Sequence, residues 1–467
     1  MVPIARRPNR ECTPSFTALL SEFRCVFTQP SFQIFLGLMT GWVLSYRRRF
    51  VTELIWSSGS LHRGHHSRYH NFFRQSVWEL DTLSCVLAQL LVAVFAPTGI
   101  IVWAVADPLC RKRGLTVYGT GMHHDPLISS RANPWVSWGH DGVVLTLLVA
   151  NPFWASTKVW SLPLAFRLYR NRQGLTKGQK GRKKAQKSPK ARRDPHHRTR
   201  PQLAVELISL MAGWFPEQQL LVSGDSAYGG ASVLQPLPPH VDLISPVHPQ
   251  GALYEPASVP GPKPRGRPPK KGRRLPGMKE WASDPAWPWQ TLVFEQFGLH
   301  ATLRVKTRQA LYYKAGKDRP LTLVLVRDAL GQRPDQMFYC PRLDWNARQI
   351  LSTYAARWSL EVTFENGKPL LGLEDPANRK EKAVRRTAPM ALVLYSLIVL
   401  WFHREGHRHL QFPDRPWYPR KQVPSFADLL TTLRRESWRE KSRTLPWPGR
   451  LVEKHLAPMV EFLSLAG

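Results

Sequence analysis

Residues 97–107 of this chain read Pro-Thr-Gly-Ile-Ile-Val-Trp-Ala-Val-Ala-Asp, and this stretch decides the fold. The first three residues predict a turn. The apolar run 100–105 is rich in β-branched residues and has the length of a central, buried strand. Asp107 comes directly after that run, at the strand end where open α/β sheets place their reactive groups. The stretch therefore predicts an α/β sheet with an acidic side chain at its functional edge.

The turn at 97–99 also decides how the long uncharged run 83–106 is interpreted. Its 24 residues are long enough for a membrane-spanning helix. Because the turn interrupts the run, we expect a buried helix, a turn and a strand, and no contact with a membrane. A membrane-associated protein is the alternative, and purification without detergent would exclude it.

The charge of the chain indicates its partner. Lys and Arg number 66 against 33 Asp and Glu among 467 residues, which gives a formal charge of +33. So large a surplus repels itself and normally persists in proteins that bind a polyanion. This argues against an enzyme of small neutral metabolites and favours nucleic acid. Residues 171–200 and 261–280 together carry +18, and we expect these two runs to contact DNA on either side of Asp225.

The cysteines indicate the compartment. There are five, widely scattered and without a C-x-x-C pair, which is typical of a reducing environment and predicts neither disulfides nor a zinc ribbon. The N-terminus shows no signal-peptide pattern. We therefore expect a cytoplasmic protein.

Five regions follow from the change of pattern along the chain. We predict a helical DNA-binding region (1–95), the first part of an α/β core with a basic loop at 171–200 (96–235), a β-rich insertion with a basic Pro/Gly loop (236–345), the second part of the core (346–405) and a helical tail (406–467).

A second candidate acid, Asp225, follows an expected strand at 219–222. Residues 224–230 read Gly-Asp-Ser-Ala-Tyr-Gly-Gly, and the glycines allow a tight turn around the carboxylate. Each aspartate taken singly also fits an ordinary turn or helix cap. Asp141, which precedes the apolar strand 143–149, is the alternative to Asp107 as the first acid.

The third acid belongs to the pattern Tyr354-x2-Arg357-x3-Glu361-x6-Lys368. At about 100° per residue, these four side chains share a helical stripe about 60° wide. Gly367 and Pro369 are expected to end the helix near Lys368. Glu365 lies close to the same stripe and is the alternative to Glu361, and a surface helix with ordinary ion pairs is the simpler interpretation.

Three carboxylates from two strand ends and a helix can hold two divalent cations, Mg²⁺ or Mn²⁺. Two such ions activate a water or a 3′-hydroxyl and stabilise the departing oxygen of a phosphodiester. Arg357 and Lys368 beside them suit phosphate oxygens. The pattern predicts phosphoryl transfer on nucleic acid.

The four-residue pattern resembles the Tyr-Arg-Glu-Lys signature of a large group of bacterial insertion-sequence transposases of the DDE class. Residues 224–229 resemble the second-aspartate motif of that group, and the strand before Asp107 is similar to its first. The resemblance covers roughly residues 20–405. Ala106 and Pro108 depart from it, because many relatives have an acid before the first aspartate and a hydroxyl residue after it.

The resemblance implies a ribonuclease H-like core, interrupted by the β-rich insertion, in which Asp107, Asp225 and Glu361 form the catalytic triad. It also implies double-stranded DNA as substrate, at transposon ends and target, a homodimer in the DNA complex, and a hairpin intermediate. Relatives stack insertion aromatics on a flipped base, which makes Trp287 and Trp289 candidates beside Tyr354, Arg357 and Lys368; packing inside the insertion is the alternative. A non-catalytic DNA-binding protein descended from a transposase is the rival function.

Overall fold

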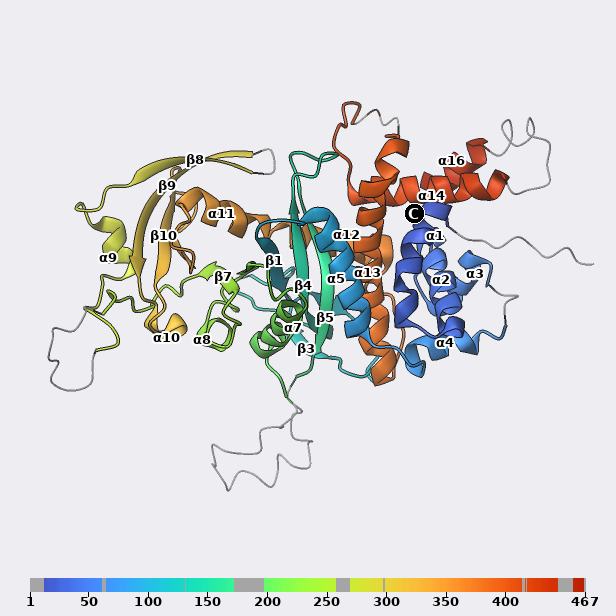
Figure 1. Cartoon of the computed structure of the whole chain (residues 1–467), viewed down its shortest axis with the longest axis horizontal. Helices are drawn as coiled ribbons and strands as arrows, with labels where there is room; N and C mark the ends of the chain where they lie inside the picture. Colours follow the sequence, from blue (N-terminus) through green and yellow to red (C-terminus); the bar gives the residue numbers. More distant parts are fainter. Residues whose placement is uncertain are drawn as a thin grey trace, which may run out of the picture.

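The computed structural model describes residues 12–60, 64–130, 132–171, 197–257, 269–296, 299–413, 416, 418–443 and 457–465. Most of the basic run 171–200, and residues 261–268 of the second run, lie outside these ranges. Figure 1 shows strands β1, β4 and β5 in the middle of the molecule, with the N-terminal helices at one end and strands β8 to β10 at the other.

A mixed sheet of 11 strands connects the parts of the described chain. The strands are β1 (Ile101–Ala106), β2 (Leu109–Arg111), β3 (Gly121–His124), β4 (Val136–Ala150), β5 (Val159–Tyr169), β6 (Leu220–Gly224), β7 (Val241–Pro246), β8 (Gln290–Gln296), β9 (Leu299–Ala310), β10 (Leu321–Asp328) and β11 (Gln336–Cys340). Their order is β2-β4-β1-β6-β7-β11-β10-β9-β8, with β3 and β5 also paired to β4.

Helices flank this sheet, and a further group of helices lies beyond one end of it (Figure 1). They are α1 (Pro14–Ser21), α2 (Gln29–Leu44), α3 (Val51–Ser58), α4 (Ser67–Arg74), α5 (Leu80–Phe95), α7 (Arg200–Trp214), α8 (Ala231–Leu234), α9 (Met278–Ser283), α10 (Tyr313–Gly316), α11 (Ala347–Ala356), α12 (Ser359–Leu371), α13 (Glu381–Arg404), α14 (Phe426–Arg443) and α16 (Ala457–Leu465), with 3₁₀ helices η1 (Glu22–Val26) and η3 (Gly406–His409).

The central strands have the connections of an α/β core. β1 runs parallel to β6, and β6 runs parallel to β7, whereas β4 is antiparallel to both β1 and β5. This mixed sheet with flanking helices is consistent with the ribonuclease H-like core that the resemblance implies. The predicted α/β class is confirmed.

The run 83–106 divides as expected into helix, turn and strand. α5 ends at Phe95, β1 begins at Ile101, and Gly99 between them has a positive φ of 81°. Among the described residues, one helix, α13, is long and apolar enough to cross a membrane, and 89% of its apolar window is buried inside the protein.

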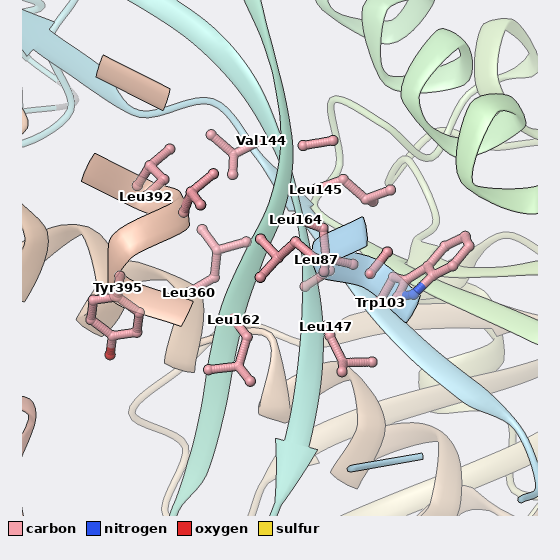
Figure 2. Packing of buried hydrophobic residues seen from close by; sticks show 14 of the residues in the cluster. Leu87, Trp103, Val144, Leu145, Leu147, Leu162, Leu164, Leu360, Leu392 and Tyr395 are labelled. Carbon is pink, nitrogen blue, oxygen red and sulfur yellow. The ribbon is translucent and has the colours of Figure 1, made fainter. Parts of the chain in front are cut away.

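The core is continuous across the sheet. β4 is buried on both faces because residues 139–147 are buried without alternation. Figure 2 shows leucines of β4 and β5 packed with side chains of α5, α12 and α13, among them Leu87, Leu360 and Leu392. Burial of these side chains is the main stabilising contribution to the fold.

The β-rich insertion extends the same sheet. β11 pairs antiparallel with β7, and β10, β9 and β8 follow as an antiparallel series. Residues 291–305 contribute to two strands of this series, β8 and β9, which pair with each other. β7 lies within the predicted insertion 236–345 but pairs in parallel with β6 of the core. The domain boundaries themselves stay predictions.

The N-terminal helices are joined to the C-terminal helices by buried hydrogen bonds. Trp42 of α2 donates its indole N–H to the carbonyl of Leu371, the last residue of α12, over 2.7 Å. The buried guanidinium of Arg434 on α14 donates to the carbonyls of Val43 and Ser45. The first and last thirds of the chain thus share one core.

Candidate active site

Two of the predicted acids lie at neighbouring strand ends. In the parallel pair β1–β6, Val105 lies opposite Gly224. Asp225 follows Gly224 directly, and Asp107 follows Val105 by two residues. Because parallel strands end at the same edge of a sheet, both carboxylates are held at one edge by buried strands on both sides.

The turn after β6 is fixed by local hydrogen bonds and by small residues. The Asp225 carboxylate accepts a hydrogen bond from the Ala227 N–H over 2.8 Å, and the Asp225 carbonyl accepts one from the Ser245 hydroxyl over 2.8 Å. A Cβ atom on Gly229 would lie 2.3 Å from the Ser245 hydroxyl and 3.0 Å from the Pro246 carbonyl. Glycine is therefore required for the turn to approach β7.

Both oxygens of Asp107 have partners. The buried Tyr228 hydroxyl donates to Oδ1 over 2.8 Å, and the Arg200 guanidinium forms an ion pair with Oδ2 at 3.0 Å. Burial, with a smaller effect from the neighbouring charge of Asp141, raises the Asp107 pKa to about 6, although Tyr228 and Arg200 act in the opposite direction. Asp225 raises it further, so it lies within electrostatic range of Asp107.

Asp141, the alternative first acid, lies in the same cluster. It is a buried residue of β4, opposite Leu109 of β2. Arg200 contacts its Oδ2 with both Nε, at 2.8 Å, and Nη2. The His123 ring lies 3.4 Å from that oxygen, and burial lowers the His123 pKa, which keeps this imidazole neutral at pH 7. The structure thus gathers Asp107 and Asp141 around one arginine, with Asp225 within electrostatic range of Asp107.

Arg200 and Tyr228 were not predicted as site residues. Arg200 belongs by sequence to the basic run, yet it begins α7, where the Thr199–Gln202 capping box fixes the helix start. Tyr228 is part of the second-aspartate motif, which by itself assigns this side chain no contact. The capping pattern Thr199-x-x-Gln202 is a sequence signal that would have separated Arg200 from the run before it.

Glu361 lies on α12 and is held by Arg357. The distance between Arg357 Nη1 and Glu361 Oε1 is 3.3 Å. The expected single helix from Tyr354 to Lys368 is wrong, because α11 ends at Ala356 and α12 begins at Ser359. Hydrogen bonds between residues three apart replace the regular pattern at the junction, including Arg357 N–H to the Tyr354 carbonyl at 3.1 Å.

The other end of the helix also differs from expectation. α12 continues through Gly367 and Pro369 to Leu371, and Gly372 ends it with a positive φ of 62°. Pro369 lies inside this helix, although it cannot donate a backbone hydrogen bond to it. Lys368 thus lies in the last turn of α12, three residues before its end.

Tyr354 on α11 and Lys368 on α12 each interact with groups at or near the strand ends. Burial raises the Tyr354 pKa, the charge of Arg357 opposes this shift and the charge of Asp225 adds to it, so the phenol lies within electrostatic range of both groups. Lys368 donates to the carbonyl of Leu109, two residues after Asp107, over 2.9 Å, and pairs with Glu374 at 3.2 Å. Glu365, the alternative to Glu361, is exposed.

The insertion tryptophans differ from one another in exposure. Trp281 is buried and its ring lies edge-on to Trp287 at 6.3 Å. Trp287 is 40% exposed with the Arg308 guanidinium 5.0 Å from its ring centre. Trp289 is half-buried between Arg327, at 4.4 Å, and Lys306, at 4.8 Å. Trp281 therefore packs the insertion, as the alternative interpretation expects, and Trp287 presents a face to solvent.

The carboxylates of the site supply part of the ligand set that a hard cation needs. Among the described residues, no group of three His, Cys, Asp or Glu side chains is close enough to hold a metal ion. Asp107 and Asp225 offer the carboxylate oxygens that Mg²⁺ prefers, and a cationic group, Arg200, already contacts Asp107. Asp107 and Asp225 are the residues at this edge of the sheet that would hold such an ion.

A mixed sheet with two acids at adjacent strand ends is consistent with a nuclease of the ribonuclease H type. The model of the DDE superfamily endonucleases matches residues 22–317, and the chain belongs to this family. The match includes Asp107 and Asp225 and ends before Glu361. Comparison with curated proteins gives no match. The family implies DNA as the substrate and phosphoryl transfer as the reaction.

Proposed function

We propose that this endonuclease is the transposase of a bacterial insertion sequence, which binds the terminal inverted repeats and cuts and joins DNA strands there. The observation that carries the proposal is the placement of Asp107 and Asp225 at adjacent parallel strand ends in a chain of the DDE endonuclease family. The charge of +33 and the Tyr354–Lys368 pattern support it. We place the protein in the cytoplasm at the nucleoid, acting as a homodimer.

Asp107, Asp225 and Glu361 would hold two Mg²⁺ ions, for which Mn²⁺ can substitute. Such ions activate the attacking hydroxyl and stabilise charge on the departing oxygen. Asp107 and Asp225 supply oxygens from fixed strand ends, so little rearrangement is needed there. Glu361 would supply its carboxylate when Arg357 transfers from it to a DNA phosphate, which can accept bidentate hydrogen bonds from a guanidinium.

The first reaction is hydrolysis of one strand. A water oxygen bonds to phosphorus, the bond from phosphorus to the 3′-oxygen breaks, and the departing 3′-oxygen takes a proton. The freed 3′-hydroxyl then attacks a second phosphodiester, so the number of phosphodiester bonds is conserved in this transfer. Lys368, which donates to the Leu109 carbonyl, would supply a cation for phosphate oxygens, and Tyr354 orients Arg357.

The insertion would bind DNA through exposed aromatic and basic groups. Trp287 offers a ring face with Arg308 alongside, and Trp289 is flanked by two cations. Stacking of a base on an aromatic side chain contributes about 1–3 kcal/mol. The N-terminal helices, α1 to α4, supply a second DNA contact in this proposal.

The test is cleavage of duplex DNA carrying the inverted repeats that flank the gene, with Mg²⁺ present. Asp225→Asn and Glu361→Gln should each reduce the cleavage rate at least about 10³-fold, because each removes a ligand charge while keeping side-chain volume. Glu365→Gln is the matched control on the same helix and should cut normally. Equal rates for wild type and the two variants would refute the assignment.

A non-catalytic DNA-binding protein is the second candidate, and the ion pair that occupies Glu361 favours it. The same experiment separates the two functions when binding and cleavage are measured together. Tight binding of the repeats by all variants, with no cutting by wild type in either Mg²⁺ or Mn²⁺, would establish the second candidate.

A further inference from the structure

One guanidinium group holds two acids at the end of β1. Arg200 Nε lies 3.0 Å from Asp107 Oδ2 and 2.8 Å from Asp141 Oδ2. The Asp141 side chain is 3% exposed, whereas that of Arg200 is 32% exposed and stacks over the Tyr169 ring at 4.5 Å. The arginine therefore has a buried contact with Asp141 and a more open contact with Asp107.

The Asp107 contact uses the oxygen that a cation would need. Oδ1 of Asp107 accepts the Tyr228 hydrogen bond, and Oδ2 faces Arg200. Two positive groups within about 5 Å of each other repel strongly where water is partly excluded. A divalent cation on Oδ2 and the guanidinium of Arg200 on the same oxygen thus compete.

We propose that Arg200 is a positioning residue that occupies the cation position on Asp107 in the metal-free protein, with Asp141 as its permanent partner. The inference rests on the proposed function, in which Asp107 is a metal ligand. When the cation binds, Arg200 leaves Asp107 and keeps its contacts with Asp141. Asp141 acts through Arg200 and is not itself a ligand.

The device couples metal binding to DNA binding. A guanidinium released from Asp107 is free to pair with a phosphate oxygen, and that pairing is among the stronger hydrogen bonds in proteins. Bound DNA therefore favours the state in which Oδ2 is available. By linkage, DNA raises the affinity for the cation, and the cation raises the affinity for DNA by the same factor.

The test measures Mn²⁺ binding to the full chain by electron paramagnetic resonance, with and without DNA, so that no cleavage is required. Arg200→Gln should bind Mn²⁺ about tenfold more tightly than wild type in the absence of DNA, since a competing charge is gone. Arg200→Lys keeps the charge and should stay within about threefold of wild type. DNA should raise the affinity of wild type and much less that of Arg200→Gln.

Two controls keep the outcomes separate. Arg167→Gln removes an arginine of β5 that is paired with Asp81 of α5 and Glu206 of α7, and it should leave Mn²⁺ affinity unchanged. The double variant Arg200→Gln/Asp141→Asn removes the whole ion pair, which avoids leaving a buried charge alone. It should bind Mn²⁺ as tightly as Arg200→Gln.

Three results would overturn the inference or its basis. Unchanged or weaker Mn²⁺ binding by Arg200→Gln shows that Arg200 does not compete. A loss of affinity in the double variant relative to Arg200→Gln shows that Asp141 is itself a ligand. Wild-type affinity in Asp107→Asn shows instead that the proposed metal site is wrong, which is a failure of the proposed function rather than of the role of Arg200 alone.

Discussion

Tyr228 donates its hydroxyl hydrogen to Oδ1 of Asp107 over 2.8 Å, and this bond joins the turn after β6 to the end of β1. The tyrosine is fully buried, so the bond is shielded from water. The second-aspartate turn therefore holds the first aspartate as well as presenting its own. The orientation of Asp107 depends on a residue 121 positions away in the sequence.

Tyr228→Phe should reduce DNA cleavage by about 10- to 100-fold with a loss of stability of only about 1 kcal/mol, because the ring packing remains and one hydrogen bond is lost. Cleavage rates and urea denaturation of the same preparations measure the two effects. Tyr339→Phe is the matched control: its buried hydroxyl donates to the Gly229 carbonyl over 3.0 Å and does not contact an acid. Equal losses of activity in both variants would contradict the positioning role.

The raised pKa of Asp107 predicts an unusual pH dependence of stability. Its carboxyl keeps a proton to about pH 6 in the folded, metal-free protein, but only to about pH 4 when unfolded. Between about pH 4 and pH 6 the folded state thus binds more protons than the unfolded state. The stability that the proton on Asp107 contributes is lost as pH rises through this range. Asp107→Asn should be more stable than wild type by roughly 1–3 kcal/mol at pH 7.5, and the difference should vanish below pH 4.

Urea denaturation in EDTA at a series of pH values measures the stability of Asp107→Asn and wild type. Asp428 provides a control of opposite sign in these measurements. Hydrogen bonds from Lys421 and Ser425 lower the Asp428 pKa, although burial has the largest single effect in the other direction. Its contribution to stability is present above the unfolded pKa and lost as pH falls, so Asp428→Asn should be destabilised at pH 7.5. A pH-independent difference between Asp107→Asn and wild type would rule out the altered titration.

Trp287→Ala should weaken binding of terminal-repeat DNA by about 1–3 kcal/mol while leaving the unfolding transition nearly unchanged, since the side chain is 40% exposed. Trp281→Ala should instead lower the free energy of unfolding by about 3–5 kcal/mol because the ring is buried. Fluorescence anisotropy and denaturation distinguish the two. Trp287→Phe should restore most of the affinity, and a failure of Trp287→Ala to weaken binding would assign this ring to packing.

DNA binding should depend steeply on salt. A protein that neutralises 6–10 phosphates loses about 10³–10⁵ in affinity between 50 and 200 mM salt. Neutralising Lys270, Lys271, Arg273 and Arg274 together should reduce the slope of log affinity against log salt by up to about 4. Titration of one DNA duplex across this salt range gives the slope. A slope typical of a single phosphate contact would show that the basic runs 171–200 and 261–280 do not contact DNA.

The strand ends could be predicted from the sequence because local signals agree there. A turn, a short β-branched run and an aspartate occur in order at Asp107, and glycines bracket Asp225. The burial of both strands then follows from their lack of polar alternation. These features need no knowledge of distant residues.

The partners of the acids could not be predicted in the same way. Arg200 contacts Asp141 across 59 positions, and its own neighbours in sequence place it in a basic run. The break between α11 and α12 could not be predicted from hydrophobic periodicity either. Arg357 and Trp358 keep helical backbone angles, and only the hydrogen bonds change, from partners four residues apart to partners three residues apart. Side-chain pairing and helix joints depend on tertiary packing.

The hydrogen bond from Trp42 to Leu371 has a consequence for where DNA is cut. It fixes α2 to the last residue of the helix that carries Glu361, and the Arg49 guanidinium adds a bond to Leu370 over 2.7 Å. If the N-terminal helices bind the repeat, the distance from the bound base pairs to Glu361 is fixed by one rigid body rather than varied by a flexible linker. The protein would then work as a ruler, cutting at a constant number of base pairs from the sequence it recognises.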